Sequence, residues 1–384
     1  MLRLVAVAML TAVVGCSSST APPTSKVTAS STPSASPSVV AITPSPTPSG
    51  AAADLPLSAV RFSCRLPVTT LTYGAESMTY QGGSVSFPAG TYAADPNGTI
   101  TFKSGFFVTQ QTPTLIGGGA PPFYDAAAGR WVPASSTVTA PDGLSYAYSS
   151  SPTPAGDAVI AVVDVTRGTE KSYHVAIPLA AAQGIEVMDY DGAGVYFVVD
   201  LPENYPEGVW RLDDATGAVT RLLNVDNVLA VRHGYAWTGS IDPHDPTPPR
   251  TPAIGHLFDT ISAVNLVSHS QTSWYYTQAR SDYLLGFASS DRPIVSVSAG
   301  PDFSSDGAEV RIIDHPDTSA EDNGELVSGP GLSLSSPQAD GDRTWFGGMG
   351  GIYLYTSAGG LQRVFVGGDN PKAGGAIVPA GFCR

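Results

Sequence analysis

The chain has 384 residues, with 33 Asp or Glu, 19 Lys or Arg, 41 Gly, 33 Pro and three Cys. This length allows two or three ordinary domains, or one large β domain with ample residues for a core. A formal net charge of -14 argues against nucleic acid as a partner, because affinity for phosphates depends on clustered Lys and Arg. The Gly and Pro content favours a fold rich in turns.

The N-terminus has the pattern of an export signal. Arg3 precedes the apolar run 4–14, which as a helix would be only about 16 Å long, too short for a bilayer core. The run ends in Val-Val-Gly before Cys16, which resembles the lipobox of bacterial lipoproteins. This resemblance implies that residues 1–15 are a lipoprotein signal peptide and that the Cys16 thiol is acylated. An ordinary secretory signal with a chance cysteine is the alternative.

Residues 16–55 are predicted to be a lipidated cysteine followed by a disordered tether. Between residues 17 and 50, 24 of 34 residues are Ser, Thr or Pro, and Lys26 is the only charge. Such a segment cannot bury enough apolar surface to offset its ordering entropy. Since two or more acyl chains bind membranes firmly, we expect an exported chain that is lipid-anchored to a bacterial membrane. Its domain, residues 56–384, would face the periplasm or the cell exterior.

A repeat begins after the tether. An alternating apolar strand, an Asp or a substitute, and a turn recur with the Asp position at residues 125, 164, 213, 265, 314 and 355, in steps of 39, 49, 52, 49 and 41. A second marker, the residue of an earlier turn, recurs in steps of 49, 42, 57 and 50 at Gly143, Gly192, Gly234, Asp291 and Gly341. A period of about 40–50 residues built from short strands is typical of β-propeller blades.

The predicted fold class is therefore all-β. Four strands fit into each repeat, and in the third repeat they are expected at 185–189, 195–199, 209–213 and 219–223. Six Asp positions predict six blades. The terminal segments 60–68 and 373–383 lie outside this count, which leaves a partial seventh blade open.

The second repeat carries a family resemblance. Its Pro141-Asp142-Gly143 turn and the apolar strand ending at Asp164 are similar to the repeat of TolB-like and other WD40-like bacterial propellers. The resemblance covers roughly residues 120–365, and the other repeats match less well. The whole arrangement also resembles uncharacterised exported propeller lipoproteins, which implies an architecture and no activity.

Cys64 and Cys383 are expected to form a disulfide. An even pair of cysteines in an exported protein favours a bond, and a propeller must bring its two ends together to close the ring. The alternative, two reactive thiols, has no Cys-x-x-Cys spacing to support it.

No linear sequence motif indicates a particular enzymatic reaction. Nucleophile-elbow, zinc-protease, phosphate-loop and EF-hand patterns are absent, so no catalytic residue and no cofactor is predicted, and a non-enzyme is favoured. The best polar cluster is Asp242, His244 and Asp245 in a Pro-rich insertion, with His256 nearby, which could bind a ligand or a metal. Asp-Pro pairs also initiate turns, so no metal is assigned.

A second acidic turn, Asp189-Tyr190-Asp191-Gly192, could hold calcium, although a solvated turn is the simpler interpretation.

Together these features predict a membrane-anchored protein-interaction scaffold or ligand-binding module. Its partners would be the membrane, through the lipid, and an unknown protein, small molecule or glycan bound at the loop-lined face or the central depression. The alternative is a hydrolase or lyase acting on carbohydrate or peptide. A propeller can gather carboxylates from several blades at its channel mouth without any linear motif.

Overall fold

A computed structural model describes residues 55–384, with gaps at 74–76, 104–107, 112–121, 151–157, 176–183, 202–203, 245–257, 279, 299, 301–307, 317–322, 349 and 368–376. The predicted signal peptide, Cys16, nearly all of the tether, Asp245 and His256 lie outside the described residues. Apart from two short 3-10 helices, the regular structure described is β-strand. None of the helices in these described ranges has the length and apolar character needed to cross a membrane.

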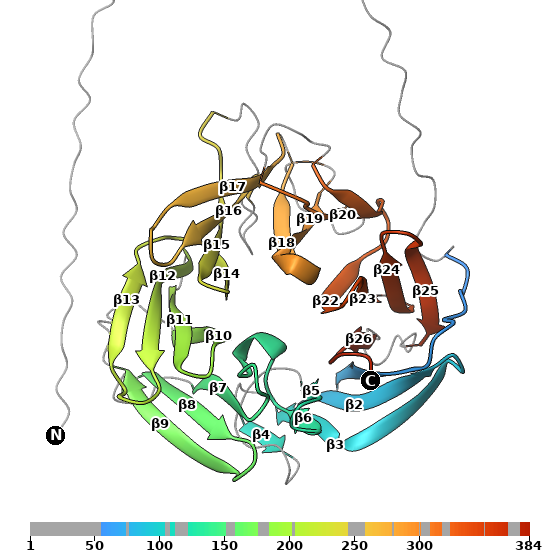
Figure 1. Cartoon of the computed structure of the whole chain (residues 1–384), viewed down its shortest axis with the longest axis horizontal. Coiled ribbons are helices and arrows are strands. Elements are labelled where there is room, and N and C mark those ends of the chain that lie inside the picture. Colours follow the sequence, from blue (N-terminus) through green and yellow to red (C-terminus); the bar gives the residue numbers. More distant parts are fainter. Residues whose placement is uncertain are drawn as a thin grey trace, which may run out of the picture. The chain divides into compact units, whose positions relative to one another are not determined.

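The first half of the ring contains four sheets (Figure 1). The first is β1 (Cys64–Tyr73), β2 (Ser77–Phe87), β3 (Thr91–Lys103) and β4 (Val108–Gln111). A two-stranded sheet, β5 (Phe123–Asp125) and β6 (Arg130–Val132), precedes the three-stranded sheet β7 (Ser145–Ser150), β8 (Ala158–Asp164) and β9 (Thr169–Val175). The fourth is β10 (Gly184–Tyr190), β11 (Gly194–Leu201), β12 (Asn204–Asp213) and β13 (Val219–Leu223).

Three further sheets complete the ring. They are β14 (Val228–Arg232), β15 (Tyr235–Ser240), β16 (Thr260–Asn265) and β17 (Gln271–Tyr276); β18 (Asp282–Phe287), β19 (Pro293–Val297), β20 (Glu309–Ile312) and β21 (Glu325–Ser328); and β22 (Leu334–Asp340), β23 (Arg343–Gly348), β24 (Gly351–Thr356) and β25 (Gly360–Val366). The last strand, β26 (Ile377–Pro379), joins this sheet to the first.

Buried side chains connect each sheet to the next around the whole ring. Seven apolar clusters are each shared by two neighbouring sheets, from the contact of β3 with β5 and β6 round to the contact of β24 with β1 and β2. The protein is therefore a β-propeller, as the repeat predicted. Its six sheets of three or four strands are consistent with six blades, and the two-stranded sheet β5–β6 lies between the first two.

The repeated Asp has a local structural cause. Asp213 ends β12, and its Oδ1 accepts hydrogen bonds from the Thr216 backbone N–H at 2.8 Å and hydroxyl at 2.7 Å. Asp164 at the end of β8 and Asp125 at the end of β5 accept backbone N–H groups in the same way. The side chain therefore satisfies the backbone donors of the turn that leads to the next strand.

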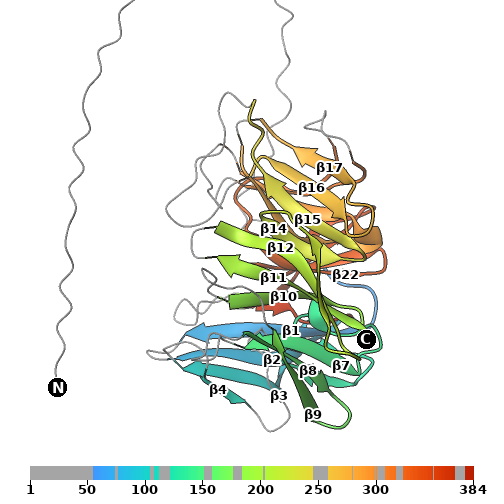
Figure 2. The ribbon, with the colours of Figure 1, turned by 90° about the vertical axis from the view of Figure 1, so that its left-hand side faces the viewer.

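The strands run across the thickness of the ring, as β10, β11 and β12 do in the side view of Figure 2. Because neighbouring strands are antiparallel, the connections gather on two opposite faces. The turns that join first to second and third to fourth strands share one face. The described ends of the connection between β15 and β16, residues 241–244 and 258–259, lie on the other.

The two ends of the domain are fastened to each other. β26 pairs antiparallel with β1, with Thr69 opposite Val378, and touches β23 through Ile377 opposite Gly348. The structure contains the expected disulfide between Cys64 and Cys383, whose Cα atoms are 5.4 Å apart although 319 residues separate them in sequence. Strand pairing and a covalent bond therefore close the ring together.

Replacing both Cys64 and Cys383 by Ser is expected to lower the free energy of unfolding by about 2–5 kcal/mol, because the bond restricts the unfolded chain over a very long loop. Denaturant titration of the wild type and the double variant measures this. As a control, a reducing agent should destabilise the wild type and leave the double variant unchanged. Equal midpoints for all samples would contradict the assigned role of the bond.

Candidate functional site

The turns next to the centre of the ring each place at least one residue in the left-handed region. In Figure 1 the innermost strands are β10, β14, β18 and β22, and their turns contain Gly192 (φ 84°), Gly234 (φ 81°), Asp291 (φ 58°) and Gly341 (φ 63°). Glycine adopts this backbone without steric cost, whereas a residue with a Cβ is strained there. Asp291 is thus the exception at a position that favours glycine.

The Asp291 side chain connects two neighbouring sheets. Its Oδ1 accepts a hydrogen bond from Arg232 Nε at 2.6 Å, and its Oδ2 lies 2.5 Å from His233 Nδ1. Burial tends to raise the pKa of Asp291, but the hydrogen bonds from Arg232 and His233 outweigh burial and hold it below its usual value. The carboxylate therefore stays ionised between a guanidinium and an imidazole.

A second carboxyl approaches the same two side chains from the preceding sheet. Burial raises the pKa of Asp189, near the end of β10, to about 6, although the backbone N–H of Tyr190 and the charges of His233 and Arg232 oppose the rise. We call Asp189, Arg232, His233 and Asp291 the inner-turn cluster. Three successive sheets contribute to it, so no sheet forms it alone.

Further hydrogen bonds connect the sheets of the inner-turn cluster to the sheets on either side of them. The Ser145 hydroxyl donates to the Tyr190 hydroxyl at 3.3 Å, and the Ser289 hydroxyl donates to the backbone oxygen of Gly341. The inner turns of five successive sheets are thus linked by side chains, which holds the cluster in place.

The inner-turn cluster can bind a polar ligand and transfer a proton. Burial raises the pKa of Asp189 to about 6, the His233 side chain is 66% exposed, and Arg232 supplies a fixed positive charge. Over the described ranges, no three His, Cys, Asp or Glu side chains are grouped so that they could hold a metal ion. Asp191, from the acidic turn considered as a calcium site, accepts the Ala193 and Gly194 N–H groups instead.

The loop predicted from the sequence as a ligand or metal site begins on the opposite face. Asp242 Oδ1 accepts the backbone N–H of His244 at 2.8 Å, and the His244 imidazole is 91% exposed and 3.2 Å from the same oxygen. The contact between Asp242 and His244 is thus that of a local turn. The other two predicted members, Asp245 and His256, lie outside the described residues, so the predicted site stays a prediction.

Two buried carboxyl groups lie at the base of that loop, and the sequence did not indicate them. Asp259, fully buried, accepts the Asp242 N–H at 2.8 Å, and the Asp282 N–H donates to the Phe258 backbone oxygen. Burial raises the pKa of Asp282 well above its usual value, opposed by a hydrogen bond from Thr277. Asp259 directly precedes β16 and Asp282 is the first residue of β18. No sequence motif joins the two positions, so only the fold brings them together.

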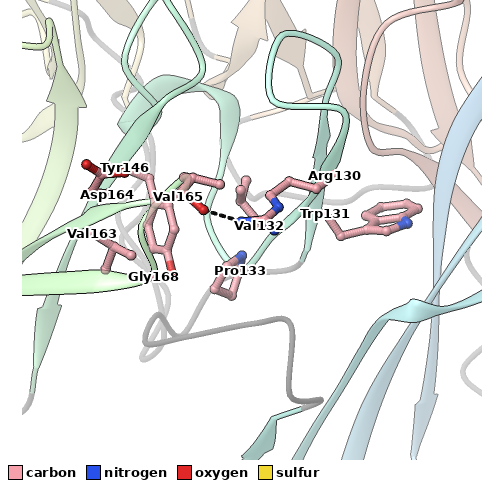
Figure 3. A pocket seen from close by; sticks show the side chains of 9 residues that line it. All are labelled: Arg130, Trp131, Val132, Pro133, Tyr146, Val163, Asp164, Val165 and Gly168. Carbon is pink, nitrogen blue, oxygen red and sulfur yellow. Dashed lines mark hydrogen bonds between the residues drawn. The ribbon is translucent and has the colours of Figure 1, made fainter.

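A pocket lies between the two-stranded sheet and the sheet β7–β9 (Figure 3). Its empty volume is about 250 Å³, which includes open solvent, and its lining includes Arg130, Val132, Pro133, Tyr146 and Val165. An Arg130 Nη1–H donates to the backbone oxygen of Val165. The pocket is small, so it admits a functional group rather than a whole large ligand.

No family model and no curated protein matches the chain. Solved structures resemble its fold: the β-propeller domain of the Trilobed protease from Pyrococcus furiosus, at a TM-score of 0.44 and 10% identity, covers 79% of this chain and 86% of that chain. An oligogalacturonate lyase in complex with manganese reaches a TM-score of 0.42 at 14% identity, over 79% of this chain and 85% of that chain.

TolB from Acinetobacter baumannii is also similar, at a TM-score of 0.38 and 12% identity over 83% of this chain. The match spans 65% of the TolB chain, which is less than two thirds of its length. These similarities concern the fold, and no activity follows from them.

Asp189→Asn is expected to stabilise the protein at pH 7 by about 1 kcal/mol, with allowance for solvent screening, and to have little effect at pH 4. The ordinary pKa is 3.8 and the folded pKa about 6, so folding favours the protonated carboxyl. Stability therefore falls as the pH rises from about 4 to about 6, and Asn removes this loss.

Denaturant titrations at both pH values measure the effect. Asp342→Asn, whose carboxylate is 88% exposed on the β22–β23 turn, is the control with the same change of charge. An equal gain at pH 4 and pH 7 for Asp189→Asn would contradict the assigned titration.

Proposed function

We propose that this protein is an exported, lipid-anchored β-propeller that binds a protein, a small molecule or a glycan at the inner-turn cluster. The observation that carries the proposal is the convergence of Asp189, Arg232, His233 and Asp291 from three successive sheets. Asp291 adopts strained left-handed backbone where the other inner turns use glycine. Strained polar residues that interact across sheets are typical of binding sites built on a rigid scaffold.

The proposed location has two independent supports. The first is the sequence up to Cys16, with the pattern of a lipoprotein signal, and the Ser, Thr and Pro-rich segment after it. The second is the disulfide between Cys64 and Cys383, since structural disulfides persist in oxidising compartments and are rare in the reducing cytosol. A long tether would let the propeller reach partners at a distance from the membrane.

Cys16→Ser is expected to move the protein from the membrane fraction to the soluble extracytoplasmic fraction, because the variant lacks the thiol that would be acylated. Fractionation of bacterial cells and mass spectrometry of the N-terminal peptide measure this. The double variant Cys64→Ser with Cys383→Ser, which removes the other two cysteines without touching the signal, is the control and should stay in the membrane. A wild-type chain that is soluble and carries no acyl group would refute lipid anchoring.

A photo-crosslinking amino acid at position 233 is expected to give specific adducts on intact cells, because the His233 side chain is exposed beside the cluster. Position 267 is the control: Val267 is 90% exposed on the same face, in an outer turn between β16 and β17. Adducts from position 233 that disappear with Asp291→Ala would support binding at the inner turns. Identical adducts from both positions would contradict it.

The second candidate, a hydrolase or lyase acting on carbohydrate or peptide, is favoured by one observation. Asp189 has a pKa of about 6 beside an exposed imidazole, which suits a general acid or base. If the protein turns over glycan or peptide substrates, loses this activity in Asp189→Asn and gives no adducts at position 233, it is this enzyme and not a binding module.

A further inference from the structure

The sheet β5–β6 has two strands, whereas its neighbours in the ring have three or four. It contributes Phe123, Val132 and nearby Val138 to the apolar cluster that packs against Tyr146 and Val163 of the next sheet. A sheet of two short strands covers less of its neighbour than a full blade does. The pocket shown in Figure 3 lies at this incomplete contact.

The pocket holds a buried hydroxyl group that has no partner. Tyr146 is 2% exposed and lines the pocket, and its Oη makes no hydrogen bond among the described residues. Its neighbour Tyr148, two residues further along β7, donates to Glu170 Oε2 at 2.8 Å. A buried hydroxyl normally finds a partner, so the unpaired Tyr146 hydroxyl points to a group that the chain itself does not supply.

Arg130 brings a positive charge to the same pocket. Its guanidinium forms no ion pair with any described residue, and its hydrogen bond to the Val165 backbone oxygen uses only part of its five N–H donors. Burial raises the pKa of Tyr146, the nearby Tyr148 and Glu170 add to the rise, and the charge of Arg130 opposes it. Arg130 and Tyr146 therefore line the same pocket from two neighbouring sheets.

The one carboxylate that lines the pocket is engaged elsewhere. Asp164 Oδ1 accepts the N–H groups of Thr166 and Arg167, and its Oδ2 is 3.2 Å from Arg167 Nη1. Asp164 thus serves its own turn and leaves Arg130 without a counter-ion.

From this geometry we infer that the pocket between β6, β7 and β8 binds a carboxylate group of a ligand, held by Arg130 and the Tyr146 hydroxyl. A charged guanidinium and a hydroxyl donor match the two acceptor oxygens of a carboxylate. Peptide C-termini and acidic sugars both carry this group. The inference rests on the proposed binding function. It adds the chemical class of a ligand, a carboxylate, and a second site that is separate from the inner-turn cluster.

Isothermal titration of the purified full chain with four probes tests the inference. Acetyl-trialanine and glucuronate carry a free carboxylate, whereas acetyl-trialanine amide and glucose are their neutral counterparts. We expect one or both acids to bind at least tenfold more tightly than the matching neutral probe. The acid that binds more tightly identifies the source of the carboxylate as peptide or sugar.

Tyr146→Phe is the most informative variant, because it removes a hydroxyl that has no partner among the residues that the structure describes. It is expected to weaken acid binding at least threefold while the melting temperature stays the same or rises. Arg130→Gln should weaken binding at least tenfold. Arg61→Gln removes the same charge from an exposed side chain outside the pocket lining, and should leave binding unchanged.

Equal binding of acids and neutral probes, or acid binding that survives both Tyr146→Phe and Arg130→Gln, would overturn the inference. Failure here is distinguishable from failure of the proposed function. The probes are measured on purified protein, whereas anchoring and adducts at position 233 are measured on cells.

Discussion

The structure depends on one constraint: a four-stranded sheet of this chain has two apolar faces, and only a neighbouring sheet can cover each of them. Seven shared apolar clusters fulfil this requirement around the ring, and the last joins the final sheet to the first. Closure is therefore a condition for burying the core of every sheet. This is why the ends of the domain meet in the pairing of β26 with β1 and in the bond between Cys64 and Cys383.

Ring closure also explains where polar chemistry can form. Side chains at the inner turns of neighbouring sheets are held close together, although about 50 residues separate equivalent turns in the sequence. Asp291 uses this proximity: its carboxylate reaches Arg232 and His233 of the previous sheet at 2.6 and 2.5 Å. The strain of its left-handed backbone is maintained by the packed sheets around it. The same proximity brings Asp189 to Arg232 and His233.

The departures from the regular ring are as informative as the repeat. The two-stranded sheet β5–β6 is attached to the closing seam by a hydrogen bond from the Tyr124 N–H to the Ala380 oxygen at 2.6 Å. On its other side it leaves the pocket beside Tyr146 and Arg130. The described ends of the connection between β15 and β16 are held by the Asp259 carboxylate, which accepts the Asp242 N–H, and by the Asp282 backbone N–H, which donates to the Phe258 oxygen.

The sequence predicted the pairing of Cys64 with Cys383 because a closed ring must bring its two ends together. By itself it also determined the all-β class and the spacing of the blades, because these follow from local signals. Strand alternation, an Asp that caps its turn and a left-handed glycine act within a few residues of each other. It also marked Asp291 as a turn position, and the missing glycine there was the available signal of a site. Only the tertiary structure decided that Asp291 meets Arg232 and His233, that the Asp282 N–H bonds the residue before Asp259, and that the Tyr146 hydroxyl has no partner among the described residues. Such contacts depend on how separate sheets pack, and no pattern within one strand encodes them.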